Sequence, residues 1–582
     1  MINTIHSING PVVTIKNTKD FFMLEMVRVG HKKLVGEVIS VNDSATTVQV
    51  YESTTSLCVG EPVEGAGYPM SVILGPGMLS NIYDGIQRPL KSIEDVSGTF
   101  IDVGITIPPI PTDKEWDVTV LAKAGDKLSQ GQIYATCPET AAVVHKMLVP
   151  PGLSGEVTYA AASGNHLVDD VIVKLKDKDD NEHQLTLCQR WPIRQQRPFL
   201  AREPMSKPLV TGQRVIDSVF PIAKGGTAAI PGGFGTGKTI TQHQLAKWSD
   251  ADIIVYIGCG ERGNEMTDVL TEFADLVDPR SGNPLMQRTV LIANTSNMPV
   301  AAREASIYTG VTMAEYYRDM GYHVAVMADS TSRWAEALRE ISGRLEEMPA
   351  EEGFPAYLPS RISQFYERAG YMKTFSGLDG SVSLIGAVSP QGADFSEPVT
   401  QNTKRFVRCF WALDKSLAYA RHYPSINWTT SYSEYIEDLT PWYRSTINSE
   451  FMSKRQAMMA LFIEEAKLME IVKLIGADVL PEDQKLVLEV AKIFRVGFLQ
   501  QNAYHKEDTY VPLEKQYRMM DAILYFYNKA KAMTSSGIPV SSITLTGIAD
   551  KLTRMKYDIP NDQPELFPAY LKDIDAALAS VK

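Results

Sequence analysis

Cysteine is scarce in this sequence, and its spacing excludes two kinds of site. The five cysteines are odd in number and scattered, and no two of them form a C-x-x-C pair; they are Cys58, Cys137, Cys188, Cys259 and Cys409. A secreted disulfide framework and a zinc ribbon both need paired, regularly spaced cysteines. We therefore expect a protein of a reducing compartment without a structural metal site.

The sequence also has fewer basic than acidic residues, and it lacks long apolar runs. There are 57 Lys and Arg residues against 69 Asp and Glu, which gives a net charge of −12. This balance argues against a nucleic-acid backbone as the main partner. No run reaches about 18 uninterrupted apolar residues, and residues 1–6 lack the basic segment and apolar core of a signal peptide. We expect a cytoplasmic chain whose membrane role, if it has one, comes through partners.

The 582 residues, 44% of them hydrophobic, are enough for three or four domains of ordinary globular composition. Short alternating runs at 11–16, 23–29, 34–39 and 46–51 predict an antiparallel β-barrel in residues 1–70. Strand–helix alternation predicts a parallel sheet in residues 71–109 and 191–437. Long amphipathic segments at 451–474, 482–494, 514–531 and 566–581 predict a helical domain in residues 438–582.

Between these parts, residues 110–190 contain frequent Pro and Gly turns, a pattern that predicts an inserted β-rich domain. The stretch resembles the β-sandwich of lipoyl or biotinyl carrier domains, with Lys146 near the position of the modified lysine. Its neighbours are His145 and Met147, however, whereas biotin carriers have Met-Lys-Met. A structural insertion is therefore the favoured interpretation, and the charged segment 174–180 is predicted to be an exposed hairpin tip.

The stretch from 226 to 248 has the order strand, loop, helix. An apolar run ends at Ile230, five of the next seven residues are Gly or Pro, and an apolar–polar pattern follows from Thr239 to Trp248. The loop fits G-x-x-x-x-G-K-[ST], the pattern of a phosphate-binding loop. Its residues, all predicted to contact nucleotide, are Gly232, Gly233, Phe234, Gly235, Thr236, Gly237, Lys238, Thr239 and Ile240.

This spacing has a physical reason. Phosphate oxygens must meet a row of backbone N–H groups, and glycines remove the side chains that would hold the anion away. The positive end of the following helix points at the same anion, Lys238 reaches the β- and γ-phosphates, and the Thr239 hydroxyl is left for Mg²⁺. The alternative, a chance Gly-rich turn before a helix, is disfavoured by the coincidence of four fixed residues with the right flanking elements.

Polar clusters follow the later strands of the predicted sheet. We expect strands at 253–257, 289–293, 324–328 and 382–388. Because ligands bind beyond the carboxyl ends of parallel strands, the clusters after them are expected to converge on one nucleotide. Asp329 closes the 324–328 run and is predicted to hold Mg²⁺ through water, although an Asp in this place can also be a simple helix cap.

Glu261 is the candidate catalytic carboxylate. It is predicted to lie in a Gly-Cys-Gly-Glu-Arg-Gly turn after the strand next to the phosphate loop, where it could orient the attacking water. Arg262 would offset charge on the γ-phosphate, and Glu265 is a further candidate Mg²⁺ residue, through water. The alternative is a surface Glu–Arg pair that caps a helix beginning near Glu265.

Taken together, these motifs resemble the catalytic A subunit of V-type and A-type rotary ATPases, in its prokaryotic form. The resemblance covers essentially the whole chain, including the 110–190 insertion that the shorter beta subunit of F-type enzymes lacks. It is carried by residues 232–239, Gly258-Cys-Gly-Glu-Arg-Gly-Asn-Glu-Met266, 294–304, 329–339, Tyr366-Glu-Arg-Ala-Gly370 and 389–398.

The resemblance implies a RecA-like nucleotide-binding domain, ATP or ADP with Mg²⁺ as ligands, and a site at each interface of an alternating A3B3 ring. It implies that Glu261 activates water and that the B subunit supplies an arginine finger in trans. It further implies a central stalk, a peripheral stalk and a membrane rotor that moves H⁺ or Na⁺, with the chain peripheral on the membrane. The aromatic adenine pocket of the family corresponds to Tyr423 and Tyr504, either of which could instead be ordinary core.

Three positions depart from the family pattern. Gly233 stands where Pro is usual, which should loosen the empty loop. Thr236 replaces the redox-active Cys of eukaryotic members, and residues 358–361, Leu-Pro-Ser-Arg, replace Leu-Gly-(Ala/Ser)-Arg. Two other interpretations stay open from sequence: another hexameric RecA-type motor, such as a Rho-like helicase or an export ATPase, and a non-hydrolysing ring subunit.

Overall fold

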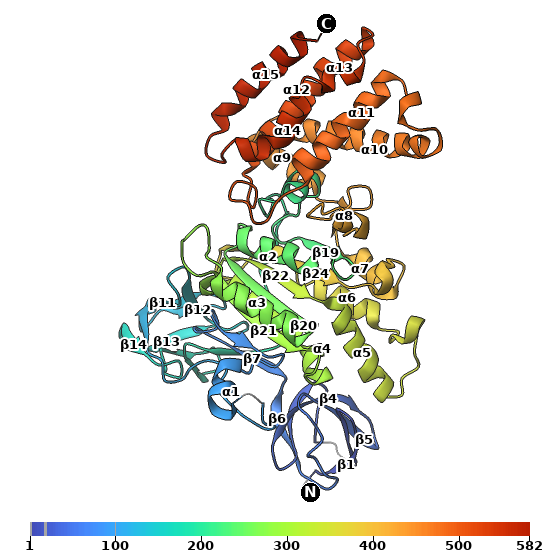
Figure 1. Cartoon of the computed structure of the whole chain (residues 1–582). Helices are drawn as coiled ribbons and strands as arrows, with labels where there is room; N and C mark the ends of the chain where they lie inside the picture. Colours follow the sequence, from blue (N-terminus) through green and yellow to red (C-terminus); the bar gives the residue numbers. More distant parts are fainter. Residues whose placement is uncertain (1–2, 17–19, 99–100, 582) are drawn as a thin grey trace. The chain divides into compact units, whose positions relative to one another are not determined.

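The computed structural model describes residues 3–16, 20–98 and 101–581 (Figure 1). These residues form two compact units, which are described in turn. The first contains residues up to 204, 225–227 and 251–406, and the second contains 205–224, 228–250 and 407 onward. No helix among these described segments is both long and apolar enough to cross a bilayer.

The first unit begins with the predicted β-barrel. Its antiparallel strands follow the order β1-β2-β5-β4-β3-β6, and the bridge between Thr4 and Pro62 brings the two edges together. Alternate side chains such as Val13, Val27 and Val48 fill the interior, as the period of two predicts. The strands are β1 (Ile5–Asn9), β2 (Val12–Lys16), β3 (Glu25–Val29), β4 (Leu34–Val41), β5 (Ala45–Val50) and β6 (Val63–Pro69).

The inserted domain consists of two four-stranded sheets, β10-β13-β15-β16 and β12-β11-β9-β14. Its charged tip is the turn between β15 and β16, as predicted. At its C-terminal end β17 (Gln189–Pro192) pairs with β7 (Ser71–Leu74), a strand that precedes the insertion in sequence. Its strands are β9 (Trp116–Val120), β10 (Lys127–Leu128), β11 (Ile133–Pro138), β12 (Val144–Leu148), β13 (Gly155–Ala160), β14 (Gly164–His166), β15 (Val173–Lys176) and β16 (Glu182–Leu185).

A buried cluster around Glu139 anchors this insertion. The Glu139 carboxylate accepts hydrogen bonds from the N–H groups of Gly77 and Leu79, from the hydroxyl of Tyr317 and from His145. The Lys146 ammonium donates to the carbonyl of Met320 at 2.8 Å. His145 and Lys146 therefore make structural contacts, as expected if this stretch is a structural insertion.

The parallel sheet of the first unit has the order β24-β22-β20-β21-β8. The 20-residue helix α4 packs against β20, β22 and β24, and every residue from Ala301 to Asp319 is buried. The strands are β8 (Ile82–Tyr83), β20 (Ile253–Glu261), β21 (Thr289–Thr295), β22 (His323–Asp329) and β24 (Asp379–Val388), with β18 (Ala201–Arg202) and β23 (Gly370–Lys373) antiparallel at one edge.

The helices of the first unit cover this sheet and its edges. They are α1 (Leu90–Ser97), α3 (Gly263–Asp275), α4 (Val300–Asp319), α5 (Thr331–Arg344), α6 (Leu358–Tyr366), α7 (Pro398–Phe406) and the short turns η2 (Leu285–Arg288), η3 (Glu351–Gly353) and η4 (Gln391–Ala393). Pro359 lies in the first turn of α6, where a missing N–H costs nothing, and this explains one departure from the family pattern.

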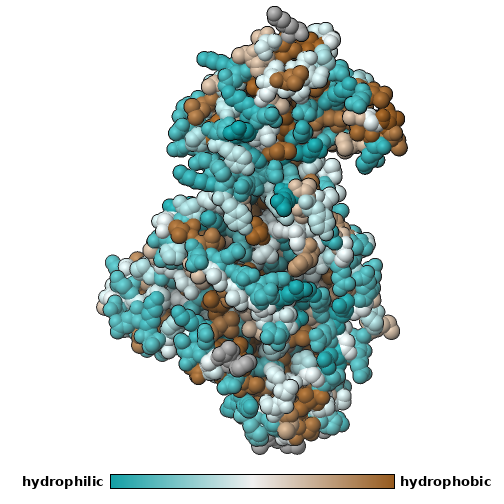
Figure 2. All heavy atoms as spheres, in the orientation of Figure 1, coloured by the Kyte–Doolittle hydropathy of each residue, from teal (hydrophilic) through white to brown (hydrophobic). Residues whose placement is uncertain are grey.

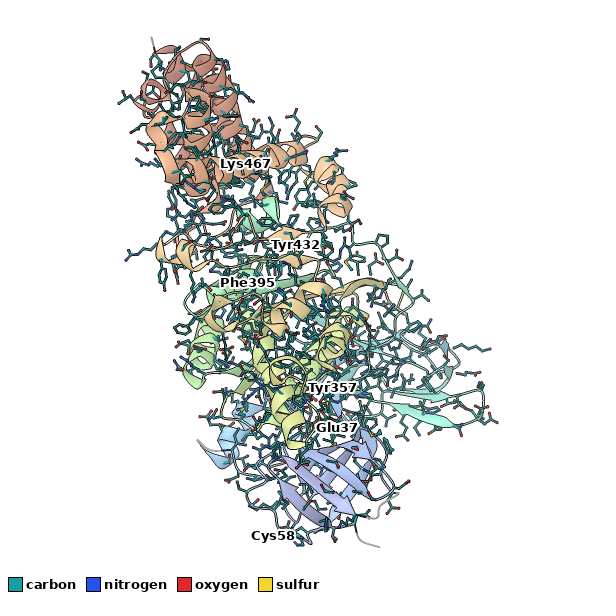
Figure 3. The ribbon with its side chains drawn as sticks, turned by 90° about the vertical axis from the view of Figure 1, so that its right-hand side faces the viewer. Glu37, Cys58, Tyr357, Phe395, Tyr432 and Lys467 are labelled. Atoms are coloured by element: carbon teal, nitrogen blue, oxygen red, sulfur yellow. The ribbon has the colours of Figure 1, made fainter. Side chains whose placement is uncertain are left out.

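An ion network ties the barrel to the parallel-sheet part of this unit. The Arg194 guanidinium donates to both oxygens of Glu37 on β4 and to both oxygens of Glu304 on α4, at 2.7–3.1 Å. Glu37 also accepts from the Tyr51 hydroxyl at 2.7 Å. Figure 3 shows Glu37 at the end of the barrel that adjoins the helices of the parallel-sheet part.

The second unit combines the phosphate loop with the C-terminal helices. Strand β19 (Thr227–Pro231) pairs in parallel with β25 (Cys409–Phe410), which pairs with β26 (Tyr432–Ser433). The helices are α2 (Lys238–Trp248), α8 (Lys415–Tyr419), α9 (Ile436–Thr446), α10 (Phe451–Ile475), α11 (Glu482–Ile493), α12 (Leu513–Ser535), α13 (Val540–Thr544), α14 (Ile548–Asp558) and α15 (Phe567–Ala579), with η1 (Val215–Val219), η5 (Ala477–Val479), η6 (Phe494–Leu499) and η7 (Pro564–Leu566).

A stripe of methionine, leucine and aromatic residues on α10 belongs to the core of the helical bundle. Met458, Leu461, Phe462 and Leu468 are buried, and Phe462 packs edge-on against Phe494. Figure 2 also shows hydrophobic atoms on the surface of the C-terminal helices. The exposed apolar residues of α10 and η5 include Ile463, Ile471, Leu474, Ile475 and Val479.

Candidate nucleotide site

The glycines give the phosphate loop a backbone that other residues rarely adopt. Gly235 and Gly237 have left-handed φ angles of 76° and 85°, which residues with a Cβ rarely adopt. A Cβ at Gly232 would lie 2.6 Å from the Thr236 hydroxyl oxygen. That hydroxyl donates to the carbonyl of Gly233 at 2.8 Å, and the Thr236 carbonyl accepts from Ser425 at 2.6 Å. Two hydrogen bonds therefore stabilise the loop conformation. One comes from the Thr236 side chain within the loop, and the other comes from the segment that carries Tyr423.

Helix α2 starts directly after the loop, at Lys238, with Gly237 as its N-cap. The first N–H groups of a helix have no partner within the helix, and its dipole makes this end positive. Lys238 and Thr239 lie in this first turn and are half-buried. The end of α2 is therefore built to receive an anion, and the ammonium adds to its positive charge.

A cavity of about 550 Å³ lies beside this loop, within the second unit. Gly235, Gly237, Ile240, Tyr423 and Tyr504 line it, so the structure brings the predicted adenine-pocket residues together with the loop. The ring of Tyr423 lies next to the loop, because a Cβ on Gly237 would be 3.2 Å from its Cε1. Tyr423 is 41% exposed and Tyr504 is 87% exposed, so neither is ordinary core.

Sequence reasoning missed several residues of this cavity. Gln244 on α2, Gln501 and Tyr557 on α14 also line it. The Gln501 N–H donates to the Tyr423 carbonyl at 2.8 Å and so couples the two aromatic-bearing segments. Gln244 could have been found from its position in the loop's own helix, whereas Tyr557 lies more than 300 residues away from that helix in sequence.

Glu261, Arg262, Glu265 and Asp329 all belong to the first unit, at the carboxyl ends of its strands. The prediction that the strand ends at Ile257 and that Glu261 lies in a turn is wrong, because β20 continues to Glu261. The glycines that suggested a turn instead make an irregularity in the pairing with β21, between Cys259 and Glu261. Gly260, with φ of 72°, is the residue inserted there.

The position of β20 also corrects the expectation that Glu261 follows the strand next to the phosphate loop. In the sheet, β20 has β21 and β22 as its neighbours. Glu261 is half-buried, and Arg262 is exposed. Arg262 begins α3 through its backbone, since its carbonyl accepts from the Met266 N–H at 2.9 Å and its side chain makes no capping bond. Glu265 lies in the first turn of that helix.

Asp329 is the last residue of β22 and is buried. The hydroxyl of Tyr256, on the neighbouring strand, donates to Asp329 Oδ2 at 3.3 Å. Burial raises the pKa of Tyr256 well above its usual value, and the negative charges of Asp329 and Glu261 raise it further. Both carboxylates therefore act electrostatically on one buried phenol.

Two arginines that the sequence reasoning gave no role surround this strand end. A Cβ at Gly260 would lie 2.7 Å from Arg333 Cβ and 2.9 Å from Arg303 Cδ. Glu336 raises the pKa of Arg333 above its usual value, and the charges of Glu261 and Glu265 contribute to the same shift. Two guanidinium-bearing side chains therefore pack at the bulge that precedes Glu261, and one of them, Arg333, interacts with the charges of Glu261 and Glu265.

Comparison with known proteins places this fold in a family. The nucleotide-binding domain of the ATP synthase alpha/beta family matches residues 212–433, and the beta-barrel domain of the same family matches residues 5–67. The ATP synthase alpha/beta subunit barrel-sandwich domain matches residues 107–194. The C-terminal domain of V and A type ATP synthase matches residues 440–543.

Among curated relatives, the chain is 61% identical to the V-type ATP synthase alpha chain 2 of Clostridium tetani, over 97% of this chain and 95% of that one. It is 55% identical to the A subunit of the A-type ATP synthase of Methanopyrus kandleri, over 96% and 95%. The assembled ATPase EscN of an enteropathogenic E. coli type III secretion system has a similar fold, with a TM-score of 0.63 over 90% of this chain and 99% of that one; at 19% identity it shows the fold alone. The chain belongs to the ATP synthase alpha/beta family, as the catalytic A subunit of a V-type or A-type rotary, ion-translocating ATP synthase.

Proposed function

We propose that this subunit binds Mg²⁺-ATP with its phosphate loop and the adjoining cavity, and that Glu261 is the carboxylate that acts on the attacking water. The observation that carries the proposal is the loop itself: left-handed Gly235 and Gly237, a helix start at Lys238, and a cavity with aromatic walls beside them. This arrangement offers N–H groups and an ammonium to a polyphosphate, and ring faces to a base.

Each end of the nucleotide has its own residues in this account. Residues 232–239 hold the phosphates, and Lys238 neutralises charge on the β- and γ-phosphates. Tyr423, Tyr504 and Ile240 hold the base. Stacking on an aromatic face suits any flat base, so these residues contribute to affinity more than to selectivity.

The oxygen donors fit magnesium. Mg²⁺ prefers oxygen ligands and is usually held by one or two protein groups together with substrate phosphates. The Thr239 hydroxyl would hold it directly, and Asp329 and Glu265 would hold it through water. When bound, Mg²⁺ neutralises charge that develops on the phosphates. Asp329 keeps its carboxylate buried at the end of β22, where one oxygen accepts a hydrogen bond from the Tyr256 hydroxyl.

Glu261 supplies the base chemistry in this proposal. A half-buried carboxylate at the end of a strand can accept a hydrogen bond from water and orient it for in-line attack. Arg262, exposed one residue further on, is proposed to offset charge on the terminal phosphate. In ATP synthesis the same groups would act on the reverse reaction, in which water leaves as the terminal phosphate is joined to ADP.

The family places the chain in a multi-subunit, membrane-bound complex. We propose the finer arrangement: three A subunits alternate with three B subunits, B supplies an arginine finger in trans, and central and peripheral stalks connect the ring to a rotor moving H⁺ or Na⁺. The isolated chain should then turn ATP over poorly, because one catalytic charge is missing. No nucleic acid takes part.

Equilibrium binding tests the assignment of the loop. Lys238→Ala should weaken ATP binding to the full-length chain by about 100-fold or more, since it removes a charge-assisted contact to phosphate. Lys247→Ala, at the other end of the same helix, is the matched control and should bind like the parent chain. Equal ATP affinity in Lys238→Ala and Lys247→Ala would reject the proposed site.

A further inference from the structure

Residues 500–504 form one wall of the nucleotide cavity. A buried group of cations contacts this wall on the side away from the cavity. Arg214, Lys515 and Lys556 are each at most 3% exposed, and the carboxylate of Asp508 lies among them. Arg214 pairs with Asp508 at 2.5 Å, and the other oxygen of Asp508 accepts from the Asn502 N–H at 2.7 Å. All these residues belong to the second unit, so the group is part of the same compact body as the cavity.

Lys556 contacts the cavity wall directly. Its ammonium donates to the carbonyls of Val496 and Gln500, at 2.7 and 2.9 Å. Arg214 donates to the same Gln500 carbonyl at 2.8 Å and to Phe498. Two cations therefore fix the one carbonyl at which the wall begins, and the next residue, Gln501, carries the bond to Tyr423.

The neighbour of Lys556 on α14, Tyr557, lines the cavity itself. Its ring centroid lies 4.5 Å from that of His505. Lys515, on α12, fixes the end of α14 by donating to the carbonyls of Lys556 and Ile559, at 3.1 and 2.7 Å. Helix α14 is thus attached on one side to α12 and on the other side to the wall of the nucleotide cavity.

Burying three cations in this group costs desolvation free energy, so their burial calls for a structural or functional explanation. Arg214, Lys515 and Lys556 lie around the Asp508 carboxylate, with Glu507 a second acid near Lys515, and burial together with the charge of Arg214 lowers the pKa of both lysines to about 8. Burial, together with the charges of Lys556 and Arg495, lowers the pKa of the nearby His422 to about 4. An apolar side chain would fill the same space without this penalty, but it could not bind carbonyl oxygens.

We propose that Lys556 is a positioning residue for the base-binding half of the nucleotide site: by holding the Gln500 carbonyl, it fixes residues 500–504 and Tyr557 against the base. The inference rests on the proposed function, because it assumes that the base enters this cavity. It assigns a role to α14, which lies beyond the residues 440–543 matched by the family's C-terminal domain.

The test compares two ligands that use different parts of the site. ATP needs both the loop and the base pocket, whereas inorganic tripolyphosphate needs only the loop. Calorimetric titration of the full-length chain with each ligand, in Mg²⁺, gives two dissociation constants for every variant. The variants are Lys556→Met, Lys556→Gln and Lys556→Arg, with Lys551→Met as the control, since Lys551 is on α14 but pairs with Asp573.

Lys556→Met should weaken ATP binding about tenfold, the effect of one lost charge-assisted hydrogen bond, and leave tripolyphosphate binding within twofold of the parent. Lys556→Arg should largely restore ATP binding, and Lys551→Met should change neither constant. In the assembled complex, Lys556→Met should raise KM for ATP more than it lowers kcat. If Lys556→Met does not fold, Lys556→Gln should show the same selective loss in smaller measure.

Two other results would overturn the inference. Equal weakening of ATP and tripolyphosphate would show that Lys556 only maintains the fold, and unchanged ATP binding would show that it does not position the wall. Tyr423→Ala separates this failure from failure of the proposed function. If Tyr423→Ala selectively weakens ATP while the Lys556 variants do not, only the inference is wrong; if Tyr423→Ala also has no effect, the base does not bind in this cavity.

Discussion

Gly260 should be essential for turnover, because it shapes the end of β20 immediately before Glu261. Its φ of 72° is left-handed, and a Cβ there would lie 2.7 Å from Arg333 Cβ and 2.9 Å from Arg303 Cδ. Arg303 Cδ belongs to a flexible side chain, but Arg333 Cβ is tied to the backbone of α5. Gly260→Ala therefore has to move the backbone that carries Glu261.

The size of the effect follows from these contacts. A left-handed alanine costs about 1–2 kcal/mol, and the overlap adds to this, so the free energy of unfolding should fall by about 2–3 kcal/mol. A displacement of Glu261 by about 1 Å should lower kcat by roughly 100-fold. ATP affinity should stay close to that of the parent, because residues 232–239 are unchanged.

The assay is steady-state ATP hydrolysis by the reconstituted complex, together with ATP binding to each variant chain. Gly263→Ala is the matched control, since a Cβ at Gly263 meets no atom within 4 Å and its φ is ordinary. We expect Gly263→Ala to hydrolyse ATP at nearly the parent rate. Parent-like turnover in Gly260→Ala would refute the argument that this bulge positions Glu261.

Further expectations follow from other sites. Arg194→Met should lower the free energy of unfolding by about 3–5 kcal/mol in urea denaturation, because it leaves the carboxylates of Glu37 and Glu304 buried without their cation; an unchanged midpoint would contradict this. Burial raises the pKa of Asp217 to about 6. The native state therefore keeps a proton that the unfolded chain has lost, and the stabilising contribution present below about pH 4 should decrease as pH rises to 6, by up to about 3 kcal/mol. Asp217→Asn should flatten that slope in denaturation measured from pH 4 to 7, and an unaltered slope would exclude Asp217 as its cause. Removing Mg²⁺ with EDTA should abolish hydrolysis, and added Mg²⁺ should restore it; hydrolysis that persists in EDTA would remove the metal from the account.

Much of the fold could be predicted because its strands and helices follow from short sequence patterns. The barrel strands alternate with period two, the strands of the parallel sheet are short apolar runs, and a run of glycines separates Ile230 from the helix that starts at Lys238. The spacing of apolar residues predicts helices at 451–474 and 514–531, and the structure has them at Phe451–Ile475 and Leu513–Ser535. Each of these signals lies within about 25 residues of sequence.

The parts that were missed depend on pairing between distant segments. The residues from Gly258 to Glu261 are typical of a turn in sequence, yet pairing of Gly258, Cys259 and Glu261 with β21 keeps them in the strand, with Gly260 as a bulge. Lys515 and Lys556 would be placed on the surface by their type, since lysines are rarely buried. Only the carbonyls of other segments, such as Ile559 and Gln500, make their burial tolerable.

Glu261 is the residue on which the hydrolytic account depends. In a single-turnover experiment, the complex carrying Glu261→Gln is mixed with radiolabelled Mg²⁺-ATP, quenched in acid and analysed for bound ATP and released phosphate. We expect ATP to bind as in the parent complex but to remain uncleaved, with a rate at least 100-fold lower. Asp268→Asn, an exposed acid on α3, should cleave ATP at the parent rate. Phosphate released by Glu261→Gln at the parent rate would contradict the account.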